Sequence, residues 1–153
     1  MDNSFLKLTE TDRNILNSFS LMLDGLGAYL GNGYELVLHS LESLDHSVIK
    51  IINGHYTGRS DGSPITDLAL KMLGQLEQDP SRTVSPYFNK NNSHSLLRSC
   101  TIPITGEHGR IIGLLCVNFH IRTLTVFIIS KKKEYARINA VYGRFFWLKK
   151  SIS

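Results

Sequence analysis

The sequence predicts an α+β fold in which a small antiparallel sheet carries helices on one face. Three observations lead to this prediction. An amphipathic helix pattern opens the chain, two pairs of strand patterns follow with a short turn inside each pair, and no strand–helix–strand repeat indicates a parallel sheet. At 153 residues the chain suits one domain, whose core needs neither disulfides nor a structural metal. We therefore expect a single packed domain.

Residues 9–30 are expected to form an amphipathic helix. Thr9 followed by Asp12 resembles a capping arrangement, and Gly31 provides a C-terminal stop. Apolar residues recur at spacings of three and four along one stripe, which consists of Ile15, Phe19, Met22, Leu26 and Tyr29, flanked by Leu16, Leu23 and Leu30. Such a helix packs on its own domain or pairs with its copy, and the heptad-like spacing is compatible with a homodimer contact.

Four segments have strand patterns. Residues 34–41 alternate in polarity and residues 48–53 are β-branched, so this pair predicts an antiparallel hairpin. Residues 96–105 and 110–121, joined by the turn-forming GEHG, predict a second hairpin. The polar segment between the pairs, residues 78–95, looks irregular, with Tyr87 and Phe88 as expected anchors into the core.

The stretch from Ile52 to Leu70 changes from a strand pattern to a helix through a glycine-rich loop. Glycine adopts backbone angles that other residues avoid, so this loop can turn sharply or approach a ligand. Ser63 followed by Pro64 is typical of a helix N-cap and first helical residue. We therefore expect a helix from about residue 64, ending before Pro80.

Several segments, in this order and at compatible spacings, resemble one known family. They are ELVLH at 35–39, NGH at 53–55, GRS at 58–60, GSPITDLAL at 62–70, LRS at 97–99 and GLLCVN at 113–118. The chain is similar to the YheO-like PAS domains at the N-terminus of bacterial transcription regulators. The resemblance implies a PAS-like antiparallel sheet with an N-terminal helix, in a domain that spans residues 9–121.

The same resemblance implies a function. We expect a cytoplasmic sensory and dimerisation domain without catalysis of its own, which binds a small polar, amino-acid-like metabolite and forms a homodimer. DNA would be bound only through a helix-turn-helix domain, which we do not expect in this chain. Residues 122–153 do not resemble that domain, and their composition would also suit a reading-frame change.

A ligand in a PAS domain lies between the sheet and the short helices, so polar residues on the inward faces of strands are candidates. Period two places Glu35 with His39, and Cys116 with Asn118. If they converge, Arg98 is expected to bind a ligand carboxylate. The alternative is that these side chains satisfy backbone groups or each other. The candidate ligand-binding residues are His39, Asn53, His55, Arg59, Arg98, Ser99, Cys116 and Asn118.

The net charge of +4 is unevenly distributed. Residues 1–121 carry 9 Lys and Arg against 12 Asp and Glu, a balance of −3, whereas residues 122–153 carry 8 against 1, a balance of +7. This basic, aromatic tail is either a poorly ordered terminus, which we favour because its aromatic residues form no single stripe, or a nucleic-acid or anionic-surface binder. Residues 123–129 look strand-like and 134–149 suit a helix.

The sequence gives little support for other classes of function. The six histidines have no paired helical spacing and the two cysteines stand apart, so we expect no metal or haem site and no cofactor. No nucleophile or phosphate-loop motif indicates an enzyme. No apolar run approaches the ~20 residues that span a bilayer, and the N-terminus lacks a signal-peptide pattern.

Overall fold

The computed structural model describes residues 5–79, 84–91, 93–123, 126 and 128–137. In chain order its elements are α1 (Glu10–Leu30), β1 (Tyr34–Ser40), β2 (Val48–Ile52), the 3₁₀ turn η1 (Gly54–Tyr56), α2 (Asp67–Gln78), β3 (Tyr87–Lys90), β4 (Leu96–Thr105), η2 (Glu107–Gly109) and β5 (Ile111–His120). The chain divides into two compact units, residues 1–120 and 121–153. The predicted domain boundary at residue 121 stays a prediction.

The five strands form one sheet in the order β2-β1-β5-β4-β3, and all neighbours are antiparallel. The α+β class and both predicted hairpins are confirmed. The two hairpins join through β1 and β5, where His39 pairs with Leu114 and Glu35 with Asn118. This pairing brings residues from the two ends of the domain sequence to the centre of the sheet. Because paired residues point to the same face, it also aligns their side chains.

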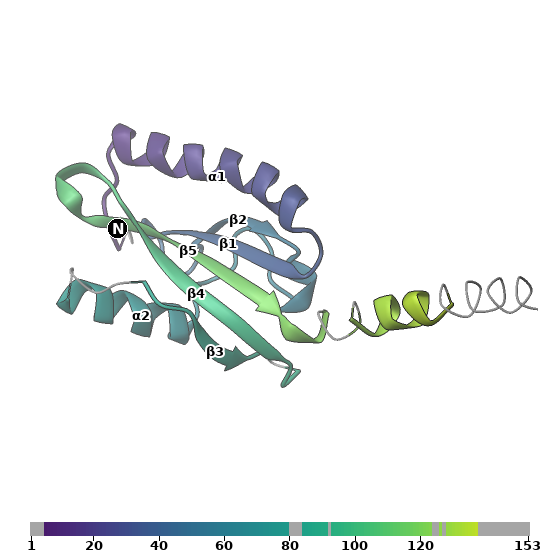
Figure 1. Cartoon of the computed structure of the whole chain (residues 1–153). Helices are drawn as coiled ribbons and strands as arrows, with labels where there is room; N and C mark the ends of the chain where they lie inside the picture. Colours follow the sequence, from purple (N-terminus) through teal and green to yellow (C-terminus); the bar gives the residue numbers. More distant parts are fainter. Residues whose placement is uncertain (1–4, 80–83, 92, 124–125, 127, 138–153) are drawn as a thin grey trace, which may run out of the picture. The chain divides into compact units, whose positions relative to one another are not determined.

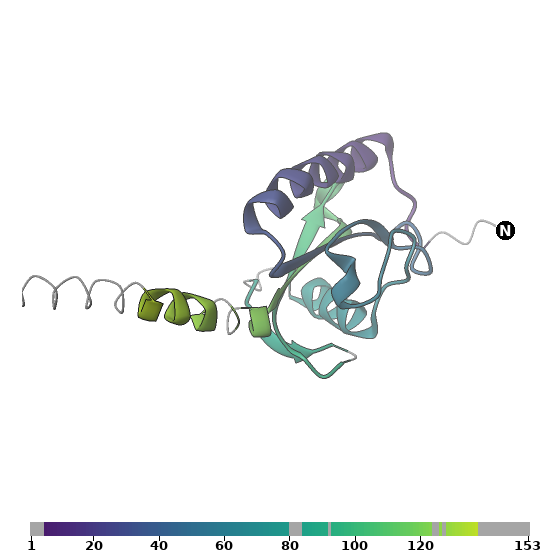
Figure 2. The same cartoon turned by 90° about the vertical axis from the view of Figure 1, so that its right-hand side faces the viewer.

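Helix α1 covers one face of the sheet (Figures 1 and 2). Its predicted capping box is present: the Thr9 hydroxyl accepts from the backbone N–H of Asp12, whose carboxylate accepts from the N–H of Thr9. The predicted stripe was misplaced, because Leu16 and Leu23 are buried whereas Met22 and Tyr29 are 47% and 88% exposed. The helix approaches β2 so closely that a Cβ at Gly27 would lie 2.8 Å from Cγ2 of Ile52.

Helix α2 packs on the opposite face through Ala69, Leu73 and Leu76. It begins at Asp67 with Thr66 as its N-cap, so the predicted start at Pro64 was wrong. Ser63 is used elsewhere: its hydroxyl accepts from the backbone N–H of Ser60, and its carbonyl accepts from Val48 N–H. These bonds tie residues 60–63 to the start of β2 and delay the helix.

The segment predicted as irregular contains the edge strand β3, which pairs with β4. Its side chains alternate, so Tyr87 is half-buried whereas Phe88, the second expected anchor, is 68% exposed. Polar composition concealed this strand, because only one of its faces meets the protein interior.

The described residues after β5 are helical at 121–123, 126 and 128–137. The strand-like interpretation of residues 123–129 was therefore wrong at every described position. The helix expected over 134–149 is observed at 134–137, and the rest lies outside the described residues. Side chains from 128 to 137 are all exposed, including three consecutive lysines at 131–133.

Candidate functional site

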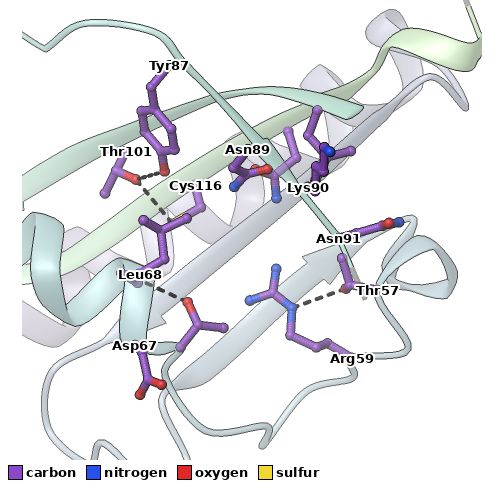
Figure 3. A pocket seen from close by; sticks show the side chains of 14 residues that line it. Thr57, Arg59, Asp67, Leu68, Tyr87, Asn89, Lys90, Asn91, Thr101 and Cys116 are labelled. Carbon is purple, nitrogen blue, oxygen red and sulfur yellow. Dashed lines mark hydrogen bonds between the residues drawn. The ribbon is translucent and has the colours of Figure 1, made fainter. Parts of the chain in front are cut away.

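A pocket of about 360 Å³ lies between the inner face of the sheet, the start of α2 and the loop after η1 (Figure 3). Strands β3, β4 and β5 supply one wall, and the loop residues Thr57 and Arg59 supply the opposite side. The lining residues are Thr57, Arg59, Thr66, Asp67, Leu68, Ala69, Tyr87, Asn89, Lys90, Asn91, Leu97, Thr101, Cys116 and Asn118. The volume lies at the small end of the range for small-molecule sites.

A fully buried carboxylate, Glu35, holds three residues of the pocket wall. Its Oε1 accepts from Nη2 of Arg59 at 2.9 Å and from Nδ2 of Asn118 at 3.0 Å, and its Oε2 accepts from the Thr57 hydroxyl at 2.7 Å. Arg59 also donates from Nε to Thr57 Oγ1 at 3.1 Å. A buried charge requires such partners, since desolvation without them is costly. Glu35 therefore fixes the loop against the sheet and compensates the charge of Arg59.

The loop reaches the end of the sheet as well. The Tyr56 ring stacks on His120, the last residue of β5, with ring centroids 3.8 Å apart. The Tyr56 hydroxyl donates to the carbonyl of Asn32, and the Tyr56 carbonyl accepts from Nδ2 of Asn91 at 3.2 Å. Burial lowers the pKa of His120. The segment from Tyr56 to Arg59 thus contacts both the pocket and the C-terminal end of β5.

Hydroxyl groups and a thiol form a chain along the strand wall. The Tyr87 and Thr101 hydroxyls are 2.8 Å apart, and Thr101 Oγ1 lies 3.8 Å from Sγ of Cys116 (Figure 3). Burial raises the pKa of the Cys116 thiol to about 11 and also raises that of Tyr87. The Cys116 thiol, which lines the pocket, is therefore protonated at neutral pH.

His39 is fully buried on the same face but does not line the pocket. Its Nδ1 is 2.8 Å from the Ser47 hydroxyl, and its Nε2 has no hydrogen-bond partner in the described part of the chain. Burial, with a smaller contribution from the nearby positive charge of Arg59, lowers the pKa of His39 to about 4. The imidazole is neutral at physiological pH.

The predicted site residues separate into two groups. Arg59, Cys116 and Asn118 line the pocket, and Ser99 is buried on the same sheet face, where it pairs with Asn118. The remaining candidates, His39, Asn53, His55 and Arg98, do not line the pocket.

Arg98 points to the opposite face, is exposed and pairs with Phe88, so the expected convergence of Arg98 with Asn118 does not occur. Asn53 has a left-handed backbone and donates to the carbonyls of Gly31 and Tyr34, which is a structural role. His55 is exposed beside Tyr56.

Sequence reasoning missed Tyr87, Asn89 and Lys90 because it did not identify β3. The signal available in the sequence was the segment YFNK at 87–90, just before the third strand pattern. Thr57 was missed because it lies between the NGH segment at 53–55 and the GRS segment at 58–60 and belongs to neither. Among the described residues, no three His, Cys, Asp or Glu side chains cluster closely enough to hold a metal ion, and no helix is long and apolar enough to span a membrane.

Comparisons with known proteins give one consistent result. The model of the YheO-like PAS domain matches residues 9–130. An uncharacterized protein of Haemophilus influenzae is 46% identical over 120 residues, which cover 78% of this chain and 53% of that protein. The uncharacterized protein YheO of Escherichia coli (strain K12) is 46% identical over 112 residues, which cover 73% of this chain and 47% of YheO. The chain thus spans about half the length of these relatives.

Solved structures give weaker matches. The PAS domain of a protein from Colwellia psychrerythraea has a TM-score of 0.45 and 15% identity, over 65% of this chain and 95% of that one. The PAS domain of the fruit-fly ELK potassium channel also has a TM-score of 0.45, with 10% identity, over 69% and 96% of the two chains. The family assignment rests on the sequence match, which covers most of the chain, including the sheet, both helices and the pocket loop. On this basis the chain belongs to the YheO-like PAS domain family, a family of sensory domains.

Proposed function

We propose that residues 9–121 are the cytoplasmic sensory domain of a bacterial transcription regulator and bind a small polar metabolite in the pocket. The observation that carries this proposal is the preorganised polar wall, in which one buried carboxylate fixes Thr57, Arg59 and Asn118. Fixed polar groups in a concave site are what small-ligand recognition requires. DNA binding by such a regulator would be performed by a region outside residues 9–121.

The charges around the pocket suit an amino-acid-sized ligand with a carboxylate. Lys90 and Arg59 line the pocket, and the guanidinium of Arg59 donates from Nη2 to Glu35 and from Nε to Thr57. The Nη1 group of Arg59 and the Lys90 ammonium are donors for an anionic group. Asp67, which is exposed, adds one negative charge at the same pocket.

The outer side of α1 supports the homodimer. Met22 and Tyr29 are 47% and 88% exposed and lie seven residues apart, so they share one helix face, and Leu21, which is 68% exposed, lies beside Met22. Large exposed apolar side chains on one face are typical of protein contact surfaces. A second copy of α1 would cover them.

The proposed signal route leads through the loop to the end of β5. Thr57 and Arg59 line the pocket, while Tyr56 of the same segment stacks on His120. A ligand that moves Arg59 would therefore also change the contact between Tyr56 and His120, the residue before position 121.

Binding is tested by thermal denaturation of the purified protein with a panel of small polar metabolites, and dimerisation by sedimentation. We expect at least one compound to raise the melting temperature of the wild type and of Arg98→Ala, whose side chain lies outside the pocket. We also expect a dimer that Tyr29→Lys weakens and that Gln78→Lys, an exposed change on α2, does not. A monomer that no compound stabilises would overturn the proposal.

The alternative function is binding of nucleic acid or an anionic surface through the basic tail. Lys131, Lys132, Lys133 and Arg137 are all exposed on the described helical residues, although Lys131 pairs with Glu134 at 2.7 Å. Salt-dependent binding to DNA or anionic vesicles that disappears after deletion of residues 122–153 would favour this alternative. Binding that survives the deletion at low salt would reject it.

A further inference from the structure

The orientation of the Asn118 amide is fixed by its partner. Asn118 is 7% exposed, lines the pocket and donates from Nδ2 to Oε1 of Glu35 at 3.0 Å. An ionised carboxylate only accepts hydrogen bonds, so the amide must turn its NH₂ group toward Glu35. Its carbonyl oxygen, Oδ1, therefore points away from Glu35, and no described residue donates to it.

A second amide oxygen in the same pocket has no partner. Asn89 lies on the inner side of β3 and lines the pocket, and its Oδ1 is buried without a hydrogen bond from any described residue. An unpaired buried carbonyl destabilises the fold, so such groups are normally paired. Asn91 provides a contrast, because its Nδ2 donates to Tyr56 and its Oδ1 accepts from Ser93 and Ser95.

Several other polar groups of the pocket wall have partners. The Tyr87 and Thr101 hydroxyls bond each other, and the Thr57 hydroxyl donates to Glu35. Among the side-chain carbonyl oxygens that line the pocket, Asn89 Oδ1 and Asn118 Oδ1 receive no hydrogen bond from a described residue. Free donors come instead from Arg59 and Lys90.

We propose that Asn89 and Asn118 receive a nitrogen-bearing group of the ligand through its N–H bonds. A primary ammonium or a carboxamide has this chemistry, whereas a ketone, ether or ester oxygen would face two oxygens and repel them. The proposal rests on the proposed function, since it assigns one end of the ligand in the same pocket. Asn89 becomes a residue that determines specificity, and Glu35 a positioning residue that acts through Asn118.

Matched probes test this assignment in the full chain. Thermal denaturation and calorimetric titration would compare 2-amino acids with 2-oxo acids of the same carbon skeleton, and carboxamides with the corresponding methyl esters. We expect the amino acids, the amides or both to bind, and the paired oxo acids and esters to bind at least tenfold more weakly.

Variants of Asn89 separate the two nitrogen groups. Asn89→Leu removes the acceptor and is expected to weaken binding of the nitrogen-bearing probe roughly tenfold, as loss of one hydrogen bond does. Asn89→Asp is expected to strengthen binding of an ammonium probe and not of a neutral amide, because only the former gains a charge pair. Phe88→Ala, on the same strand but facing outward, is the control and should leave affinity unchanged.

The outcomes distinguish this inference from the proposed function. If oxo acids or esters bind as tightly as their nitrogen-bearing partners, or if Asn89→Leu remains folded and binds normally, the inference is overturned while a sensory pocket remains. If neither these probes nor the wider metabolite panel stabilises the protein, both fail. Melting temperatures without ligand establish that each variant is folded.

Discussion

The two faces of the sheet differ in how many polar groups they bury and in whether those groups have hydrogen-bond partners. On the α1 face the buried cluster is made of leucines and isoleucines. The buried polar residues there have partners: Asp12 accepts from the backbone of Thr9 and Glu107 and from Arg110, and the Ser40 hydroxyl accepts from the backbone of Glu42. On the α2 face the buried polar residues include Glu35, His39, Ser99, Thr101, Asn118 and His120.

Unpartnered buried atoms follow the same division. His39 Nε2, Asn89 Oδ1, Ser99 Oγ and His120 Nε2 belong to the α2 face, whereas Arg110 Nε lies beside Asp12. Polar groups without partners reduce stability, and one of these, Asn89 Oδ1, lines the pocket, so their distribution fits the ligand binding that we propose for the α2 face. The α1 face, by comparison, is an apolar packing surface. The predictions below test this difference.

The largest effect is expected for Glu35→Ala. The change leaves Arg59 without its partner and Asn118 and Thr57 without their acceptor, so it should lower the free energy of unfolding by about 3–5 kcal/mol. Urea denaturation measures this effect. Arg59→Ala in the same background should cost much less than it does in the wild type. Additive effects of the two substitutions would mean that the pair is not coupled.

Leu23→Ala tests the apolar packing of the α1 face. Leu23 is fully buried under α1, and truncation should cost about 3 kcal/mol through lost burial and a residual cavity. Ligand affinity, measured by calorimetry at a temperature where the variant is folded, should not change. A large loss of affinity would show that the two faces are not independent.

His39, on the α2 face, makes the stability of the protein depend on pH. Its pKa in the folded protein is about 4, below the ordinary value of 6.5, so between these values the unfolded chain binds the extra proton. Stability should therefore be fully present above about pH 6.5 and fall by up to about 3 kcal/mol as pH decreases toward 4. His120, whose pKa is also lowered by burial, contributes a change of the same sign below its ordinary value.

Asp12 titrates in a separate, more acidic window. Hydrogen bonds, first of all from the Thr9 backbone, lower its pKa from 3.8 to about 2, so its contribution is present above pH 3.8 and is lost as pH falls toward 2.

Urea denaturation at pH 7 and pH 4.5 tests the contribution of His39, because Asp12 does not titrate between these values. The difference in the free energy of unfolding between the two pH values should be smaller for His39→Gln than for the wild type. An unchanged difference would exclude His39 as the source.

The smallest effect is expected for Arg98→Ala. The side chain is exposed on the outer face, opposite the pocket, so both stability and ligand affinity should change by less than about 0.5 kcal/mol. Denaturation and calorimetry on the same preparation measure both quantities. A clear loss of affinity would restore Arg98 as a ligand contact and require a rearranged β3.

The sequence by itself determined the elements that depend on local signals. The capping pair of Thr9 and Asp12, the two hairpins and the loop motifs all follow from short-range hydrogen bonds and period-two patterns, and the structure confirms the elements they predicted. These signals also sufficed for the α+β class and for the family. Cys116 and Asn118 were found because strand periodicity places them on the inward face, and Arg59 was found because it lies in the glycine-rich loop.

Only the tertiary structure decided which side chains meet. Ser63 lost the N-cap position to Thr66 because its groups bond Ser60 and Val48 instead. Strand β3 exists because β4 offers it an edge, and its register turns Asn89 inward and Phe88 outward. Glu35 holds Asn118 of the pocket wall because β1 pairs with β5, which follows more than eighty residues later in the chain. Local patterns determine which face a side chain occupies, but contacts between distant strands depend on register, which is fixed only when the whole sheet packs.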